Sequence, residues 1–236
     1  MHSKDQVLLE GIQLFLGGVG KITKQRKDSI QFRVFSRHEL ELIIGHFNKY
    51  PLLTQKRADF ELFKKAFDLI SREEHLTTKG LEKLIAIKAS VNNGLSPALK
   101  AAFPDIIPAS RPLVLNQEIK DPNWLAGFAE GEACFSLRVV TSEKSKAGAR
   151  VWLRFQLAQH GRDEQLMRRL VEYLGCGHYY TYASTEVGEF IVERLADITE
   201  KIIPFFVKYP LLGAKAKDFA FVKLQIDFEL RFVLSI

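Results

Sequence analysis

The sequence predicts an α+β protein made of two copies of one unit, each with antiparallel strands covered by helices on one side. The first observation is an internal repeat, in which "HSKDQVLLEGIQLFLGGVG" (residues 2–20) returns as "HGRDEQLMRRLVEYLGCG" (160–177), and "KYPLLTQKRADF" (49–60) returns as "KYPLLGAKAKDF" (208–219). The offsets of 158 and 159 positions are nearly constant, which indicates two copies of one unit. The other two observations are hairpin patterns in the second copy and a proline-rich joint.

The second copy shows the hairpins most clearly. The segments "FSLRVV" and "VWLRFQLA" alternate between apolar and polar residues on either side of "TSEKSKAG", which predicts a β-hairpin. We expect a helix over residues 163–174, ended by Gly175 and Gly177. The segments "HYYTYAS" and "GEFIVER" predict a second hairpin, followed by a helix through "LADITEKIIPFFVKY". Four antiparallel strands with helices on one side is the simplest arrangement.

The joint between the copies is "FPDIIPASRPLVLNQEIKDP", whose four prolines favour an extended linker. This predicts a first unit over residues 1–103, a linker over 104–122 and a second unit over 123–236. The last residues, "LQIDFELRFVLSI", replace the long helical tail of the first copy. They contain no helix stop and suggest no physical role, so we interpret them as a truncated or altered tail.

Composition limits the function classes. The 236 residues are 47% hydrophobic and include 18 phenylalanines, which is enough for real cores. No long apolar run or secretory signal is present, so we expect no membrane partner. The two cysteines, Cys134 and Cys176, form no disulfide framework and fit a reducing compartment. The net charge of +6 favours a polyanionic partner without establishing one.

Strand alternation predicts a polar face on each sheet. Phe135, Leu137 and Val139 share the apolar side of one strand, while the intervening residues share the other side. A solvated face is the simple alternative, but Arg and Gln side chains can read guanine and adenine edges, and a β-ribbon fits the major groove. The residues predicted to contact DNA are Lys21, Thr23, Gln25, Gln31, Arg33, Phe35, Ser136, Arg138, Val140, Trp152, Arg154, Gln156, His178, Tyr180 and Tyr182.

The stretch "DPNWLAGFAEGEACF" at 121–135 predicts a helix that ends at Glu132. Gly127 and Gly131 lie one turn apart, so a second helix could approach this one closely. A glycine inside a helix costs about 0.5–1 kcal/mol, and close packing would explain it. Glu132 then lies at the edge of the polar face, although a packing seam with a solvated glutamate is the commoner outcome of such a pattern.

These segments together resemble the LAGLIDADG homing endonucleases, in particular the single-chain type encoded in mitochondrial introns. The resemblance rests on "LAGFAEGEACF", "FQLAQH", "LGCG", "KYPLLGAKAKDF", "FNKYPLLTQKRADFELFKKAF" and "HLTTKGLEKLIAIKASVNNGL", and covers nearly the whole chain up to about Lys223. It implies two pseudo-symmetric αββαββα units whose saddle-shaped antiparallel sheets straddle a long double-stranded DNA site. It also implies divalent-metal-dependent phosphodiester hydrolysis and location in the mitochondrial matrix.

The resemblance assigns roles to four residues. Glu132 matches the metal-binding catalytic acid, which would hold Mg²⁺. Gln159 matches a glutamine that organises water near the scissile phosphate, and Lys215 and Lys56 match pocket lysines that stabilise developing phosphate charge. Glu130 would point elsewhere on the helix, as a surface or buried polar residue.

The first copy departs from the family pattern. By the repeat offset, Gln159 corresponds to Met1, so the first signature helix, its acid and the first hairpin are absent from this sequence. Ala133 replaces a usual glycine. We expect a monomer that makes no double-strand break alone and that could need a missing N-terminal segment in trans, so whether the chain is an enzyme stays open. The alternatives are a non-cleaving nucleic-acid-binding protein, such as a maturase that binds intron RNA, and a non-functional fragment.

Overall fold

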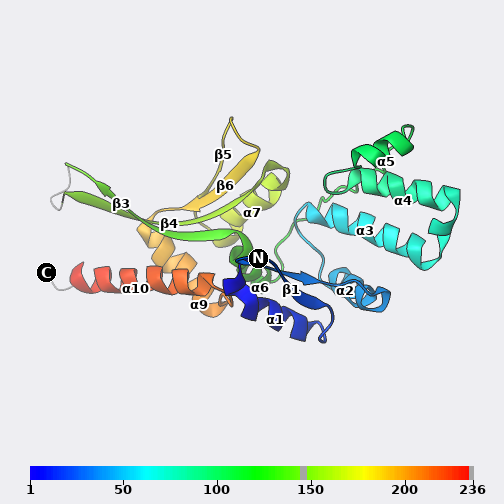
Figure 1. Cartoon of the computed structure of the whole chain (residues 1–236). Coiled ribbons are helices and arrows are strands. Elements are labelled where there is room, and N and C mark those ends of the chain that lie inside the picture. Colours follow the sequence, from blue (N-terminus) through cyan, green and yellow to red (C-terminus); the bar gives the residue numbers. More distant parts are fainter. Residues whose placement is uncertain (144–147, 234–236) are drawn as a thin grey trace. The chain divides into compact units, whose positions relative to one another are not determined.

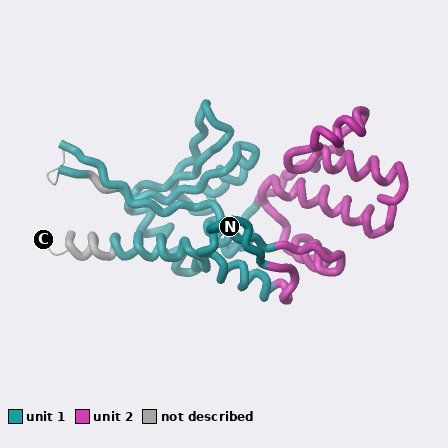
Figure 2. Tube along the Cα trace, in the orientation of Figure 1, with its two compact units in different colours: residues 1–15, 22–32, 118–236 teal, residues 16–21, 33–117 magenta. Residues whose placement is uncertain are grey.

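The computed structural model of the chain describes residues 1–143 and 148–233 (Figure 1), with the side chains of 150, 151 and 227–233 left aside. The chain divides into two compact units (Figure 2). Unit 1 contains Met1–Phe15, Ile22–Phe32 and Glu118–Ile236, and unit 2 contains Leu16–Lys21 and Arg33–Gln117. This division does not follow the repeat, because the start of the first copy groups with the second copy.

Unit 1 is built on a four-stranded antiparallel sheet in the order β3-β4-β6-β5. The strands are β3 (Ala133–Thr141), β4 (Ala149–His160), β5 (His178–Thr181) and β6 (Val187–Val192). Both predicted hairpins of the second copy are therefore confirmed. The strand expected in "HYYTYAS" is shorter than predicted, because β5 ends at Thr181. Part of the predicted turn "TSEKSKAG" lies outside the described residues.

Helices cover one face of this sheet. After the 3-10 turn η3 (Gly161–Asp163) comes α7 (Glu164–Leu174), and Gly175 ends it with a φ of 64°. The next predicted helix runs through α8 (Leu195–Asp197), a π-helical turn η4 (Ile198–Ile202) and α9 (Ile203–Lys208). The last helix is α10 (Lys215–Val233). The α+β class with antiparallel sheets and helices on one side is confirmed.

The core of unit 1 is a cluster of phenylalanines between β3, β4 and the covering helices. Phe155 is 1% exposed, and its ring centroid lies 5.0 Å from that of Phe135 and 5.5 Å from that of Phe206. Phe219 of α10 lies 5.5 Å from Phe135 in an edge-on arrangement. Such edge-to-face pairs add about 0.5–1.5 kcal/mol each beyond the burial of apolar area.

The tail "LQIDFELRFVLSI" has a structural role that the sequence interpretation missed. Its residues up to Val233 continue α10, and Ile226 is only 2% exposed. The helix packs along β3, which explains an apolar residue at position 226. Residues 234–236 lie outside the described part of the chain.

The first copy contributes a smaller set of elements to unit 1. These are the turn η1 (Ser3–Asp5), α1 (Gln6–Phe15) and most of a two-stranded sheet, β1 (Lys21–Arg26) and β2 (Ser29–Arg33). The start of the chain lies against β2, since Met1 and Ile30 exchange two backbone hydrogen bonds of 2.9 Å.

Unit 2 is mainly helical, with α2 (Arg37–Lys49), α3 (Lys56–Ser71), the turn η2 (Glu74–Leu76), α4 (Thr78–Ser90) and α5 (Pro97–Ala102). Ser36 and Thr77 cap α2 and α4 with their side-chain oxygens. Residues 103–121 contain no helix or strand, as expected for the linker.

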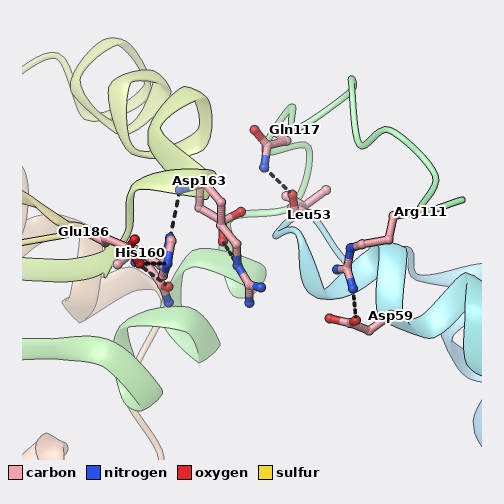
Figure 3. A network of polar contacts seen from close by, with 9 residues as sticks. Leu53, Asp59, Arg111, Gln117, His160, Asp163 and Glu186 are labelled. Carbon is pink, nitrogen blue, oxygen red and sulfur yellow. Dashed lines mark hydrogen bonds and ion pairs between the residues drawn. The ribbon is translucent and has the colours of Figure 1, made fainter. Parts of the chain in front are cut away.

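The linker is nevertheless fixed where it crosses unit 2 (Figure 3). Gln117 is 1% exposed and donates a hydrogen bond of 2.9 Å to the Leu53 carbonyl, and Arg111 pairs with Asp59 at 2.6 Å. In the part of the chain that the structure describes, no helix is long and apolar enough to cross a membrane.

Candidate active site

The helix α6 (Pro122–Glu132) leads into β3 and ends at the predicted acid. Asp121 caps its start by accepting a hydrogen bond of 2.9 Å from the Asn123 amide, and Pro122 occupies the first turn, where its missing N–H is harmless. Leu125 and Ala129 are fully buried and pack the helix against the rest of unit 1. The Glu132 side chain is exposed at the junction between α6 and β3.

Ala133 causes no strain at this junction. Its φ of −78° and ψ of 156° are ordinary extended values. Only a left-handed backbone would favour glycine at this position, so alanine fits here without a conformational cost.

The small-residue face of α6 is open. A methyl group added at Gly127 or at Gly131 would meet nothing within 4 Å. No helix within the described ranges 1–143 and 148–233 packs closely on these two positions.

Glu130 does not have the passive role that the sequence interpretation gave it. Its Oε2 accepts hydrogen bonds from the Leu212 amide (3.1 Å) and the Gly213 amide (2.9 Å), and its Oε1 accepts one from the Lys215 amide (3.3 Å). Asp5 accepts a hydrogen bond from the Ala214 amide at 2.9 Å. Both carboxylates therefore lie at the N-terminus of α10, where negative charge stabilises a helix.

Lys215, the first residue of α10, lies in the electrostatic field of the acids on and near α6. Its Nζ approaches the Ala129 carbonyl at 3.4 Å. Burial lowers the pKa of Lys215, and the charges of Glu130 and Glu132 oppose that shift. Lys215 therefore lies against α6, the helix that ends at Glu132.

The other two predicted catalytic residues belong to other elements. Gln159 lies near the end of β4, opposite Gly188, and its Oε1 accepts a hydrogen bond of 3.3 Å from the His160 amide. The next residue, His160, pairs with Glu186 at 3.0 Å (Figure 3). Lys56 is exposed at the start of α3 in unit 2, the same place in its helix that Lys215 has in α10.

At the end of α6, Glu132 is the carboxylate available to bind a metal ion. Among the described residues there is no group of three or more His, Cys, Asp or Glu side chains that could hold a metal, and Glu132 forms no hydrogen bond or ion pair with them. An exposed carboxylate suits a hard cation such as Mg²⁺, which keeps several waters and takes substrate phosphate oxygens as ligands. The donor set therefore fits such an ion only if DNA completes its coordination.

The polar face of the four-stranded sheet gathers the residues predicted to contact DNA in the second copy. Facing residues in neighbouring strands form successive rows across it. The rows are Arg138 with Trp152; Ser136 with Arg154; Cys134 with Gln156, Ile191 and His178; and Ala158 with Glu189 and Tyr180. We call this surface the polar face.

Three further features complete the polar face. Val140, on β3 and 46% exposed, continues the row pattern opposite Arg150. Tyr182 lies beyond β5, but its hydroxyl donates a hydrogen bond of 2.7 Å to Glu189. The Ser136 hydroxyl is buried and has no hydrogen-bond partner within the described part of the protein, so it is available to a water or a ligand.

Sequence reasoning missed the two acids of this face. Glu193 accepts a hydrogen bond of 2.6 Å from the Arg154 Nε, and Glu189 accepts from Tyr182, whose pKa that bond raises. The signal was present, because period-two alternation along β6 places Glu189, Ile191 and Glu193 on one side. Acids that hold arginine and tyrosine in place restrict the directions in which those side chains can donate.

The residues predicted for the first copy lie on and beside β1 and β2. The side chains of Thr23 and Gln25 lie together, with a hydrogen bond of 3.1 Å from the Gln25 amide to the Thr23 hydroxyl. Lys21 and Gln31 are exposed, Arg33 is half-buried at the end of β2, and Phe35 is 72% exposed just beyond it.

Comparisons with known proteins agree with this arrangement. The model of the family described as LAGLIDADG endonuclease matches residues 1–67 and 125–225. The chain belongs to the LAGLIDADG endonuclease family. A protein of Neurospora crassa named probable intron-encoded endonuclease 3 is 41% identical over 221 residues, which cover 93% of this chain and 41% of that protein. Probable intron-encoded endonuclease 2 of the same fungus is 37% identical and is matched over 50% of its length. The chain thus spans about half the length of these relatives, or less.

A solved LAGLIDADG structure has the same fold. The I-SmaMI LAGLIDADG homing endonuclease bound to cleaved DNA matches with a TM-score of 0.95 and 40% identity, over 98% of this chain and 77% of that chain. Another matched structure is an I-SmaMI variant in which two lysines, 159 positions apart in that protein, are replaced by alanine.

Proposed function

We propose that this LAGLIDADG family chain binds a long double-stranded DNA site with its polar face and presents Glu132 and Lys215 to a phosphodiester bond. The observation that carries the proposal is that the polar face continues into the end of α6 where Glu132 lies. The row that contains Cys134 and Gln156 begins two residues after Glu132, and Lys215 lies within electrostatic reach of that acid. One surface therefore leads from side chains suited to base edges to a free carboxylate with an ammonium group beside it.

The polar face has the chemistry for duplex recognition. Arg138 and Arg154 can donate paired hydrogen bonds to guanine, and Gln156 can pair with adenine. Arg154 is held by Glu193, which limits its freedom before DNA arrives. A net charge of +6 supplies the non-specific attraction to phosphates.

At the scissile bond, we propose that Glu132 holds a divalent ion such as Mg²⁺ together with DNA oxygens and water. When bound, such an ion activates water and neutralises charge on the leaving oxygen. Lys215 would place its ammonium against developing phosphate charge, and Gln159 would orient a water molecule. Lys56 would take the role of Lys215 at the other strand. The spacing of 159 positions between Lys56 and Lys215 equals that of the two lysines replaced in I-SmaMI, which supports this pairing.

We propose further that the chain as it stands acts as a monomer and makes no double-strand break, because it offers one signature acid. A tandem protein tests this directly. In the tandem protein, a second copy of residues 121–158 is placed ahead of Met1, so that by the repeat offset a copy of α6 and of the β3–β4 hairpin precedes the first repeat. The target is the duplex formed by joining the exons that flank the gene's intron. We expect double-strand cleavage with Mg²⁺ by the tandem protein and none by the original chain.

Two variants of the tandem protein assign the chemistry. Replacing both copies of the acid, as in Glu132→Gln, should lower cleavage at least about 1,000-fold while duplex affinity changes less than about threefold. The matched control is Glu172→Gln, an exposed glutamate on α7. Efficient cutting of both strands by the original chain would contradict the one-acid proposal, and loss of binding in Glu132→Gln would contradict the separate role of the acid.

Binding measurements separate DNA from RNA as the partner. Anisotropy titrations of the original chain with the exon-junction duplex and with intron RNA, over a salt series, should show tighter binding to the duplex and a linear loss of affinity with the logarithm of salt concentration. Preference for folded intron RNA would instead favour the maturase alternative. Because its relatives are named intron-encoded endonucleases, we also propose a mitochondrial matrix location, which organelle fractionation can test.

A further inference from the structure

The loop before α10 is held by carboxylates from two distant parts of the sequence. Four consecutive backbone amides, those of residues 212–215, each donate to a side-chain oxygen. Glu130 receives three of these hydrogen bonds and Asp5 receives the remaining one. A helix N-terminus leaves such amides without partners in the helix itself, so the two carboxylates complete α10.

The same contacts fix the distance between the two central residues of the proposed site. Glu130 lies on α6 two residues before Glu132, and it binds the amide of Lys215 as well as those of the preceding loop. The Lys215 side chain in turn reaches back to the Ala129 carbonyl of α6. The packing of α10 along β3 holds the helix as a whole, and these contacts add a direct tie between its first residue and α6.

We propose that Glu130 and Asp5 form a carboxylate clamp that positions Lys215 beside Glu132, and that neither is a metal ligand. The clamp rests on the proposed function of Glu132 and Lys215 and adds positioning residues to it. Both oxygens of Glu130 are engaged by amides, whereas the carboxylate of Glu132, in the described part of the chain, is engaged by none. The two acids of α6 therefore have different roles. Glu130 holds the start of α10, which carries Lys215, and Glu132 faces the phosphate.

Gly213 shows how closely the clamp is built. A Cβ at this position would lie 2.5 Å from Oε1 of Glu130, 2.8 Å from its Cδ and 3.1 Å from Cδ2 of Leu8. A Cβ atom does not come this close to a carboxylate oxygen or carbon, so a side chain at position 213 must displace the Glu130 carboxylate. The variant Gly213→Ala thus disturbs the clamp without changing any charge.

Amide hydrogen exchange on the full chain tests the clamp independently of catalysis. In Glu130→Gln the amide group of glutamine replaces one accepting oxygen, so exchange at residues 212, 213 and 215 should accelerate about tenfold or more. Asp5→Asn should act mainly at Ala214, and Gly213→Ala should reproduce the effect of Glu130→Gln. The control Glu200→Gln alters an exposed glutamate elsewhere in unit 1 and should leave these amides unchanged. Unchanged exchange in all three clamp variants would overturn the proposal.

Cleavage by the tandem protein tests whether the clamp positions Lys215 for chemistry. With Glu130→Gln at the original position, kcat should fall about tenfold while duplex affinity stays within about twofold, because a misplaced lysine weakens the transition state rather than the complex. Faster exchange with undiminished kcat would also overturn the proposal. If the unaltered tandem protein cuts no duplex, the proposed function fails, and hydrogen exchange alone then decides whether the clamp exists.

Discussion

The helices α7 and α1 occupy the same place in the two copies of the repeat, but their surroundings differ. Leu170 of α7 is completely buried, whereas Ile12, its counterpart at the offset of 158, is 39% exposed. On α1, Val7, Leu14 and Phe15 are also more than 70% exposed. The difference lies in the sheet, since α7 packs against the four-stranded sheet and β1 and β2 form a sheet of only two strands.

The comparison of α1 with α7 shows that the apolar sequence pattern of a helix does not determine how far its side chains are buried. Both helices have apolar residues at helical spacing, and both form. How much each apolar residue stabilises the protein depends on whether another element removes it from water. The two helices therefore share their local structure and differ in how much burial stabilises them.

The largest expected effect is on the buried side chain of this pair. Leu170→Ala should lower the free energy of unfolding by about 2–5 kcal/mol, because it leaves a cavity between α7 and the sheet. Ile12→Ala should cost about 1 kcal/mol or less, because water already reaches the site. Urea denaturation of both variants checks the contrast, and equal losses would mean that α1 is as well covered as α7.

The glycines that follow the two helices should give a smaller contrast. Gly177 has a φ of 79°, and a Cβ there would lie 2.7 Å from the Ile191 carbonyl oxygen and 2.8 Å from Val192. Gly18 has a φ of 80°, but its surroundings are open to 4 Å. Gly177→Ala should therefore cost about 2–3 kcal/mol and Gly18→Ala about 1 kcal/mol, the conformational cost alone. Thermal unfolding measures both, and a cost at Gly18 as large as that at Gly177 would argue against the open environment.

The smallest effect concerns the equivalent lysines. Burial lowers the pKa of Lys215, so its charged form is disfavoured in the folded state, and this penalty is present at neutral pH and is relieved as pH rises towards the ordinary lysine pKa. Lys215→Met should raise the unfolding free energy at pH 7 by a few tenths of a kcal/mol, a small value because the side chain is partly solvated. The gain should shrink by pH 10. The control Lys56→Met removes an exposed lysine at the equivalent position in α3. A gain for Lys215→Met that grows with pH would reverse the assignment.

Much of the fold could be predicted from patterns of neighbouring residues. Period-two alternation identified β3 and β4 and their apolar face, and Gly175 marked the end of α7. No role could be assigned to the tail from its sequence, because the helix depends on packing: Ile226 is buried beside β3 and the phenylalanine cluster. The sequence alone shows only an apolar segment without a residue that would end a helix, because it does not show β3, against which the segment packs.

The candidate site was predicted partly from pattern and partly from resemblance. Glu132 was singled out at the end of a glycine-marked helix, whereas Lys215, next to the repeated "KYPLL" segment, was assigned its role by its match to a family lysine. The contribution of Asp5 could not be predicted, because it acts on a residue 209 positions away and no local pattern connects them. Glu130 was misjudged for the same reason, since its three donors come from a loop more than 80 positions later.

The helix α10 has a mechanical consequence. Its first residue is Lys215, and Phe219, Val222 and Ile226 of the same helix floor the sheet whose other side is the polar face. A helix of 19 residues is a stiff rod of about 28 Å. If the chain binds DNA as proposed, any bend that the duplex imposed on the sheet would be transmitted along this helix to the Lys215 ammonium group, and DNA shape would then be coupled to the placement of a charge.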